Sequence, residues 1–190
     1  MMLGRNVGSD ETWKRIPSDS VGIELGVWKG DSSAKFLLKS KLLHLVDPWS
    51  VLPYESSDEF GDYNGYLSRY KNMVGSTDPK DFQKFYDNIY TEVVNRFKND
   101  SVVIHRCTTD EFFTTFNDTV DWVYVDALHN FEGCLNDLRN SLAVVKDGGF
   151  IFGDDYGNKP GVVAAVDQFI KETNLTLVIF AGTQYEIQVK

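Results

Sequence analysis

The chain has 190 residues, enough for one domain with a sizeable hydrophobic core and too few for a second domain of similar size. Lys and Arg number 19 against 28 Asp and Glu, which gives a net charge of −9, and no basic cluster stands out. That charge argues against nucleic acid and anionic membranes as partners. No apolar stretch approaches the roughly 20 residues of a membrane span, and the first ten residues lack the apolar core of a secretory signal, so we expect a soluble cytoplasmic protein.

Strands and helices alternate from residue 21 onward, a pattern that predicts parallel strands joined by helical crossovers. Short apolar runs predict strands at residues 21–25, 42–46, 102–105, 120–125 and 149–152. Apolar residues at helical spacing predict crossover helices over residues 31–39, 131–145 and 162–170. Residues 175–180 and 185–189 flank a Gly-Thr turn and predict a terminal hairpin. We therefore expect one α/β domain over residues 1–190, with a doubly wound, Rossmann-like sheet that is mostly parallel and has one antiparallel strand.

The stretch between the second and third predicted strands divides into two unlike halves. Residues 79–98 carry aromatic and apolar side chains at helical spacing, with Asp78 placed to cap the helix and Pro79 at its first position. We interpret this half as a core helix packed on the sheet. Residues 51–75 mix tyrosines, acidic residues and glycines without that period. A loop of this length is usually functional or disordered, so we interpret it as a candidate substrate-side lid, with an oligomer contact as the alternative.

The sequence Glu24-Leu-Gly26-Val-Trp-Lys-Gly30 follows the first predicted strand. Its glycines allow a sharp turn and a close approach to a ligand, and the helix that follows directs its N–H groups to the same place. The turn lacks the G-x-G-x-x-G pattern of dinucleotide sites, and Glu24 would repel a pyrophosphate, so an uncharged or zwitterionic ligand fits better. Asp47 ends the second strand, where an acid commonly accepts hydrogen bonds from a ribose diol. Without Asp47, the glycines would be equally compatible with an ordinary strand-to-helix turn that binds no ligand.

Two acidic clusters, Asp126-Ala-Leu-His129 and Asp154-Asp155, each follow an apolar run predicted to be a buried strand. Ligands bind at the carboxyl ends of the strands in an open α/β sheet, so we expect these side chains to converge on one crevice. Carboxylates that meet repel one another unless a cation or a proton holds them, and three oxygen donors without a thiolate suit a hard ion such as Mg²⁺. The alternative is that the acids only cap strand-to-helix turns.

His129 stands three residues past Asp126, at the predicted start of a helix. An imidazole there can accept a proton near neutral pH, which makes His129 a candidate general base. A histidine in this place can also serve only to cap or shield the helix start, and both interpretations stay open. Lys159, in the loop after Asp155, is the reserve candidate for the base.

Together these motifs resemble the class I S-adenosylmethionine-dependent methyltransferases, over about residues 21–190. The turn that contains Glu24, Gly26 and Gly30 is similar to the family's first motif, whose loop surrounds the amino-acid part and the ribose of the cofactor. Asp47 is similar to the ribose-binding acid of that family. The resemblance implies S-adenosylmethionine as the cofactor, bound at these four residues.

The second half of the chain is similar to the macrocin O-methyltransferase type, small-molecule and sugar O-methyltransferases that bind a divalent metal through three acids. The two acidic clusters carry the likeness, together with the Gly-Gly-Phe-Ile-Phe-Gly that precedes the second. By this resemblance Asp126, Asp154 and Asp155 are the metal ligands, with Mg²⁺ or another divalent cation. His129 and Asp126 are the candidate catalytic residues, His129 as the base and Asp126 beside the cofactor sulfur. Close relatives often carry Gly-x-Ser where this chain has Cys-Thr-Thr109, and Thr109 is the residue expected near the adenine.

Three functions remain open. The first is a metal-dependent O-methyltransferase for a hydroxyl of a sugar or other small polar molecule, in which the ion lowers the pKa of an acceptor aligned behind the methyl carbon. The second is a metal-independent methyltransferase for an amine or a carboxylate. The third is a cofactor-binding protein without turnover, or a sugar-modifying enzyme of the same fold. The expected partner is a small-molecule acceptor, without nucleic acid or membrane, and a homo-oligomer stays open.

Overall fold

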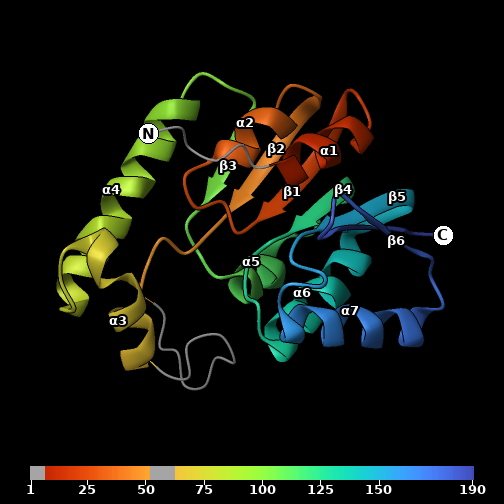
Figure 1. The fold of residues 1–190 in the computed structure, drawn as a ribbon. Helices are drawn as coiled ribbons and strands as arrows, with labels where there is room; N and C mark the ends of the chain where they lie inside the picture. Colours follow the sequence, from red (N-terminus) through yellow and green to blue (C-terminus); the bar gives the residue numbers. More distant parts are fainter. Residues whose placement is uncertain (1–6, 52–62) are drawn as a thin grey trace.

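The structure is a computed structural model, and it describes residues 7–51 and 63–190. Within these residues seven strands form one sheet in the order β3-β2-β1-β4-β5-β7-β6 (Figure 1). The strands are β1 (Ser20–Leu25), β2 (Ser40–Val46), β3 (Val102–His105), β4 (Val120–Val125), β5 (Val145–Gly153), β6 (Leu177–Phe180) and β7 (Gln184–Gln188). β1 pairs in parallel with β2 and β4, whereas β7 runs antiparallel to both β5 and β6. The predicted mostly parallel sheet with one antiparallel strand is confirmed.

Helices cover both faces of the sheet (Figure 1). They are α1 (Val7–Arg15), α2 (Asp31–Phe36), α3 (Tyr63–Val74), α4 (Pro79–Phe97), α5 (Thr109–Thr115), α6 (Phe131–Val144) and α7 (Pro160–Thr173). One hydrophobic core lies between the sheet and α2 and α4, and the other between the sheet and α5, α6 and α7. The expected doubly wound arrangement is confirmed. No helix in the described part of the chain is long and apolar enough to cross a membrane.

β4 shows how the sequence produces burial on both faces. Trp122 and Tyr124 lie in the core with α2 and α4, while Val123 and Val125 lie in the core with α6 and α7. The strand is apolar on both faces because parallel strands in such a sheet are covered on both sides. Burial of each large side chain contributes about 1.5–3 kcal/mol. The strand is thereby held at the centre of the molecule, and its carboxyl end carries Asp126.

The interpretation of residues 51–75 as one irregular loop is wrong for Tyr63–Val74, which form α3. Tyr66 and Leu67 of this helix are buried and pack with Phe82 of α4. Short helices owe most of their stability to such packing, which outweighs the weak propensity of a glycine-containing sequence. Residues 52–62, the rest of the candidate lid, lie outside the described residues. The other half of the prediction is confirmed, since α4 begins with Asp78 as N-cap, whose side chain accepts from the Lys80 amide at 2.9 Å.

Two helices, α1 and α5, have no counterpart in the sequence prediction. α1 precedes the first strand, and its buried Thr12 donates to Gln184 Oε1 of β7 at 2.6 Å. α5 begins with a capping box in which the Thr108 hydroxyl accepts from the Glu111 amide and the Glu111 carboxylate accepts from the Thr108 amide. The Thr-x-x-Glu pattern is the local signal that identifies this helix start.

Candidate active site

The residues that follow four neighbouring strands stay in register at the carboxyl edge of the sheet. The Asp47 amide donates to the His105 carbonyl at 3.2 Å, and the Gly26 amide to the Val46 carbonyl at 2.9 Å. The Asp126 amide donates to the Leu25 carbonyl at 2.9 Å, and the Asp154 amide, after β5, donates to the Val125 carbonyl at 3.3 Å. Because each bond continues the ladder past the strand end, the structure brings the predicted site residues of β2, β1, β4 and β5 side by side in that order.

Gly26 permits close packing between two of these turns. It has φ of +86°, and a Cβ added there would lie 1.9 Å from the Asp126 carbonyl oxygen. Gly30 has φ of +75°, and its Cβ would meet the Phe97 ring at 2.7 Å. Both positions therefore require glycine for the fit of the chain on itself, in addition to any approach of a ligand.

Asp47 holds the backbone of the glycine turn. Its Oδ2 accepts from the Val27 amide at 3.0 Å and the Trp28 amide at 2.9 Å, and its Oδ1 accepts from the Trp49 amide at 2.7 Å. Burial raises the pKa of this carboxyl, while the three amide donors oppose that rise. The predicted ribose acid is thus also the residue that shapes the turn, a role that sequence reasoning missed.

Glu24 lies beneath the turn, with a side chain only 1 % exposed. Its carboxyl accepts a hydrogen bond from the Ser33 hydroxyl of α2. Burial raises the pKa of Glu24 to about 8, and the nearby Asp126 and Asp47 charges act in the same direction. Glu24 is then largely protonated at neutral pH, so it repels a pyrophosphate less than its sequence position suggests. The missing G-x-G-x-x-G pattern is therefore the stronger argument against a dinucleotide.

Asp126, His129 and Asp155 form a compact group in which one ligand atom from each residue lies within 4.8 Å of the others. His129 Nε2 is 3.1 Å from Asp155 Oδ2 and 3.8 Å from Asp126 Oδ1. Burial raises the pKa of Asp126 to about 6; the Asp154 and Asp155 charges add to the rise, and His129 opposes it. Asp155 also has φ of +65°, an unusual conformation that clusters at functional sites.

The loops on either side fix this group in place. Asn130 is the N-cap of α6, because its Oδ1 accepts from the Gly133 amide at 2.8 Å, so His129 does not cap this helix. The start of α7 packs on the same loop: a Cβ added at Gly161 would lie 2.4 Å from the His129 carbonyl oxygen. This close approach sets the turn after β5, with Asp155, against the turn after β4.

Asp154, predicted as a third metal ligand, is not in this group. Its Oδ1 accepts from the Thr183 hydroxyl at 2.6 Å and from the Asp155 amide at 2.6 Å. Thr109, predicted near the adenine, is the first residue of α5. Lys159, the reserve base, is the N-cap residue of α7.

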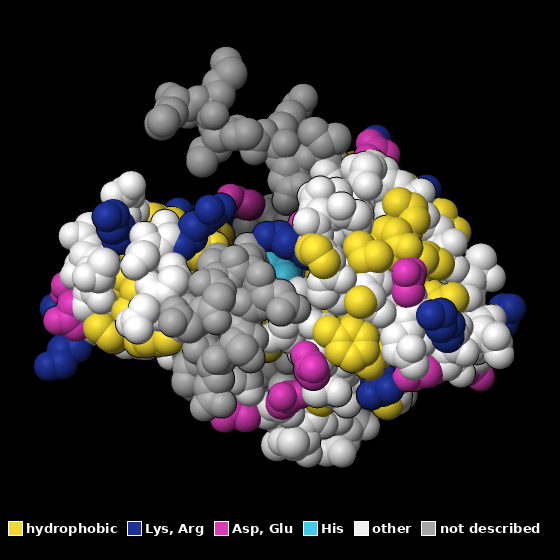
Figure 2. Space-filling model, turned by 60° about the horizontal axis from the view of Figure 1, so that its bottom comes forward, with side chains coloured by type: hydrophobic (Ala, Val, Ile, Leu, Met, Phe, Trp, Pro, Cys, Tyr) yellow, Lys and Arg dark blue, Asp and Glu magenta, His cyan; other side chains and the backbone are white. Residues whose placement is uncertain are grey.

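Figure 2 shows the face of the molecule that lies at the bottom of Figure 1. A histidine side chain is visible there, recessed between two larger bodies of side chains and next to Lys or Arg side chains. Acidic side chains are also present on this face. Side chains of both charge signs therefore lie on this side of the molecule.

A family model described as a methyltransferase domain matches residues 23–156, which is more than half of the chain and spans β1 to the turn after β5. The chain belongs to this methyltransferase family. The expected enzyme class, an S-adenosylmethionine-dependent methyltransferase of class I, is confirmed at this level. Comparison of the sequence with curated proteins gives no match.

Solved structures share the fold of the methyltransferase at low sequence identity. A precorrin-6y C5,15-methyltransferase of Geobacter metallireducens GS-15 has a TM-score of 0.64 at 9% identity, over 97% of this chain and 88% of that one. An rRNA methylase of Streptococcus thermophilus gives 0.60 at 10%, over all of both chains. The N-methyltransferase NodS of Bradyrhizobium japonicum WM9, in complex with S-adenosyl-L-homocysteine, gives 0.55 at 13%, over 97% and 88%. One fold thus carries methyl transfer to different acceptors.

Proposed function

We propose that this methyltransferase is an O-methyltransferase of the macrocin type, which transfers a methyl group to a hydroxyl of a sugar or other small polar molecule with help from a divalent cation. The observation that carries the proposal is the group of Asp126, His129 and Asp155 directly beside the glycine turn. The net charge of −9 favours a small polar acceptor over nucleic acid. The proposal includes a homo-oligomer, because a contact between two copies of the chain is the alternative interpretation of residues 51–75.

The cofactor is proposed to lie across the turn, against Gly26, Gly30 and Asp47, with Glu24 beneath it and Thr109 on the adenine side. S-adenosylmethionine supplies a methyl group on a positively charged sulfur. Asp126 follows the neighbouring strand and lies against Gly26, so its carboxyl is well placed to attract that positive charge. The solved complex of NodS with the demethylated cofactor supports this ligand class for the fold.

The donor set also fits a divalent cation. Two carboxylates and an imidazole nitrogen meet in one group, and the charge of Asp154 adds to the repulsion among the acids. A cation would relieve that repulsion, and oxygen donors with one imidazole suit Mg²⁺ or Mn²⁺. We therefore propose Asp126, Asp155 and His129 as ligands in this geometry, with Asp154 held beside them by Thr183. A bound ion would act as a Lewis acid on the acceptor hydroxyl.

A second candidate is a methyltransferase that needs no metal. The 3.1 Å contact between His129 Nε2 and Asp155 Oδ2 favours it, because a carboxylate that holds an imidazole is a common arrangement for a general base. In this case His129 would take the proton of the acceptor, and Asp126 would face the sulfonium. The two candidates differ in what His129 does: it holds an ion in the first and moves a proton in the second.

Metal removal separates the candidates. Purified enzyme is treated with a chelator, and Mg²⁺ or Mn²⁺ binding is then measured by calorimetry in the presence of S-adenosylhomocysteine. We expect binding by the wild type, loss of at least tenfold in affinity in Asp155→Asn, and no change in Asp167→Asn, an exposed acid of α7. Methyl transfer from labelled cofactor to a panel of small sugars and polyols should stop in chelator and return with the ion. Full activity in chelator would establish the metal-independent candidate.

A further inference from the structure

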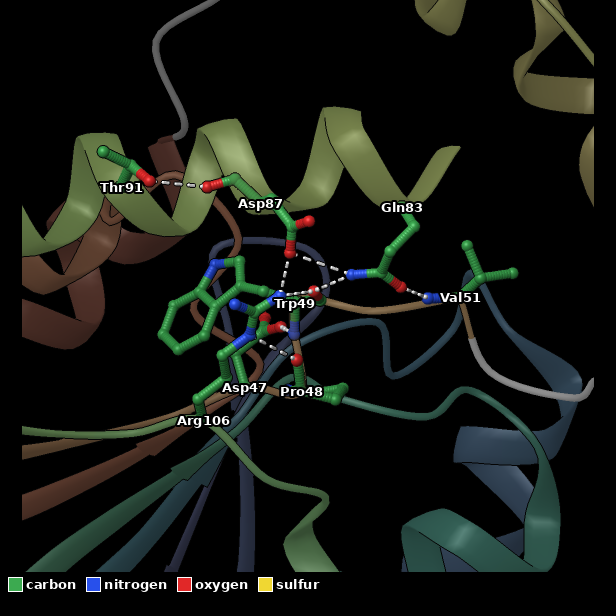
Figure 3. Close-up of polar contacts among 8 residues, drawn as sticks. All are labelled: Asp47, Pro48, Trp49, Val51, Gln83, Asp87, Thr91 and Arg106. Atoms are coloured by element: carbon green, nitrogen blue, oxygen red, sulfur yellow. Dashed lines mark hydrogen bonds and ion pairs between the residues drawn. The ribbon is translucent and has the colours of Figure 1, made fainter. Parts of the chain in front are cut away.

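A hydrogen-bonded network connects α4 to the backbone that follows β2 (Figure 3). Asp87 of α4 forms an ion pair with Arg106, which follows β3, and accepts from Gln83 Nε2 at 3.0 Å. Both donors also reach the carbonyl oxygen of Trp49, at 2.9 Å from Arg106 Nη2 and 3.3 Å from Gln83 Nε2. Gln83 Oε1 accepts from the Val51 amide at 3.2 Å. Two side chains, Gln83 and Arg106, therefore hold a short segment of main chain to which neither belongs, and Asp87 holds both of them.

Trp49 is the centre of this segment. Its side chain is fully buried, and its φ of +39° is unusual for a residue other than glycine. Such a conformation persists only where the surroundings over-determine it. Here Asp47 Oδ1 accepts from the Trp49 amide, and Arg106 and Gln83 donate to its carbonyl, so both peptide groups of the residue are held.

The indole of Trp49 passes this constraint to the glycine turn. Its Nε1 donates to the Trp28 carbonyl at 2.8 Å, and the Trp28 amide donates to Asp47 Oδ2 at 2.9 Å. Trp28 itself has φ of +53°. Asp47 thus holds the Trp28 amide, and the Trp49 indole holds the Trp28 carbonyl. Asp47 and Trp49 are themselves joined by a hydrogen bond, and Arg106 and Gln83 hold Trp49. A continuous path of contacts runs from Asp87 through Arg106 and Trp49 to the turn.

We propose that Asp87, Gln83 and Arg106 are positioning residues for the cofactor, which act through Trp49 on the turn that contains Gly26. The proposal rests on the proposed function, because it takes that turn to be the cofactor site. The Asp87–Arg106 pair is partly exposed, so its contribution to global stability is small. The role in positioning can therefore be separated from a role in folding.

The test measures S-adenosylhomocysteine binding by calorimetry in Asp87→Asn, in Gln83→Ala and in Trp49→Phe, which removes the Nε1 donor together with the pyrrole ring of the buried indole. We expect the dissociation constant to rise about 5- to 20-fold in Asp87→Asn and in Trp49→Phe, and less in Gln83→Ala. Asp81→Asn is the matched control, since Asp81 pairs with Lys84 on the same helix outside the network, and it should bind as the wild type does. The double variant Asp87→Asn/Trp49→Phe should lose clearly less than the product of the single losses, because both changes interrupt one path.

Amide hydrogen exchange in the free protein supplies a readout that needs no ligand. In Asp87→Asn the Val27 and Trp28 amides should exchange at least threefold faster, while amides in β4 and α6 keep wild-type rates, which a general loss of stability would not produce. Wild-type affinity and exchange in Asp87→Asn, or fully multiplicative losses in the double variant, would overturn the positioning role alone. Absence of binding by the wild type would overturn the cofactor proposal and the positioning role with it.

Discussion

The two halves of the site lie on one edge of one sheet, yet they are built in opposite ways. At the ends of β1 and β2 the polar groups are paired, as the three backbone amides that donate to Asp47 illustrate. At the ends of β4 and β5, Asp126 and Asp155 converge with His129, and burial together with the Asp154 and Asp155 charges raises the pKa of Asp126 to about 6. A paired turn presents fixed geometry to a ligand, whereas converging carboxylates favour a partner with positive charge. The comparison suggests that the first half holds the cofactor and the second half performs the chemistry.

His129→Ala is expected to have the largest effect, and it acts on the half of the site that contains Asp126 and Asp155. We expect methyl transfer to fall by about 10²- to 10⁴-fold, whether His129 serves as a general base or as a ligand. The dissociation constant of S-adenosylhomocysteine should stay within about twofold of the wild type, because His129 belongs to the other half of the site. Stopped assays with labelled cofactor measure the first quantity and calorimetry the second. Equal losses in turnover and in cofactor binding would mean that the two halves do not act separately.

Glu24→Gln probes a buried acid under the paired half. The pKa of Glu24 is raised from 4.5 to about 8 in the folded protein, so the unfolded chain releases its proton first as the pH rises. The Glu24 contribution to the free energy of unfolding is therefore complete below pH 4.5 and is lost between pH 4.5 and 8. The loss amounts to a few kcal/mol at most, since each pKa unit corresponds to about 1.4 kcal/mol.

Urea unfolding at several values between pH 5 and pH 8 measures this effect. The wild type should lose stability relative to Glu24→Gln as the pH rises, because glutamine has no proton to release. Parallel stability curves for the two proteins would show that Glu24 is not held protonated in the fold.

Asp47→Ala has the smallest of these expected effects and tests the half of the site in which the polar groups are paired. We expect weaker S-adenosylhomocysteine binding by roughly 1.5–3 kcal/mol, since three amides lose a charged acceptor and the turn loses its anchor. Asp31→Ala removes an exposed acid at the start of α2 and serves as the control for lost charge near the turn. Calorimetry compares the two variants, and wild-type affinity in Asp47→Ala would contradict the proposed cofactor position.

The apolar pattern of the sequence predicts the sheet and the place of the candidate site. Strands that must be buried on both faces appear as apolar runs, and their spacing with helices between them predicts parallel pairing, so the polar residues that follow β1, β2, β4 and β5 had to meet at one edge. Local signals also identified α4, because Asp78 and Pro79 mark its start. The start of α3 also shows helical spacing, in Tyr63, Tyr66, Leu67 and Tyr70. The glycine within this stretch and the acidic residues before it concealed that period.

What each side chain contacts follows from the tertiary fold. Sequence spacing treats Asp154 and Asp155 alike, yet the φ of +65° at Asp155 and the Thr183 hydroxyl on Asp154 separate their roles. The network of Asp87 and Arg106 joins residues 19 positions apart, and the Thr183 bond to Asp154 joins residues 29 apart. No local pattern specifies such pairs, because hydrogen bonds between distant residues depend on where the whole chain places each backbone turn.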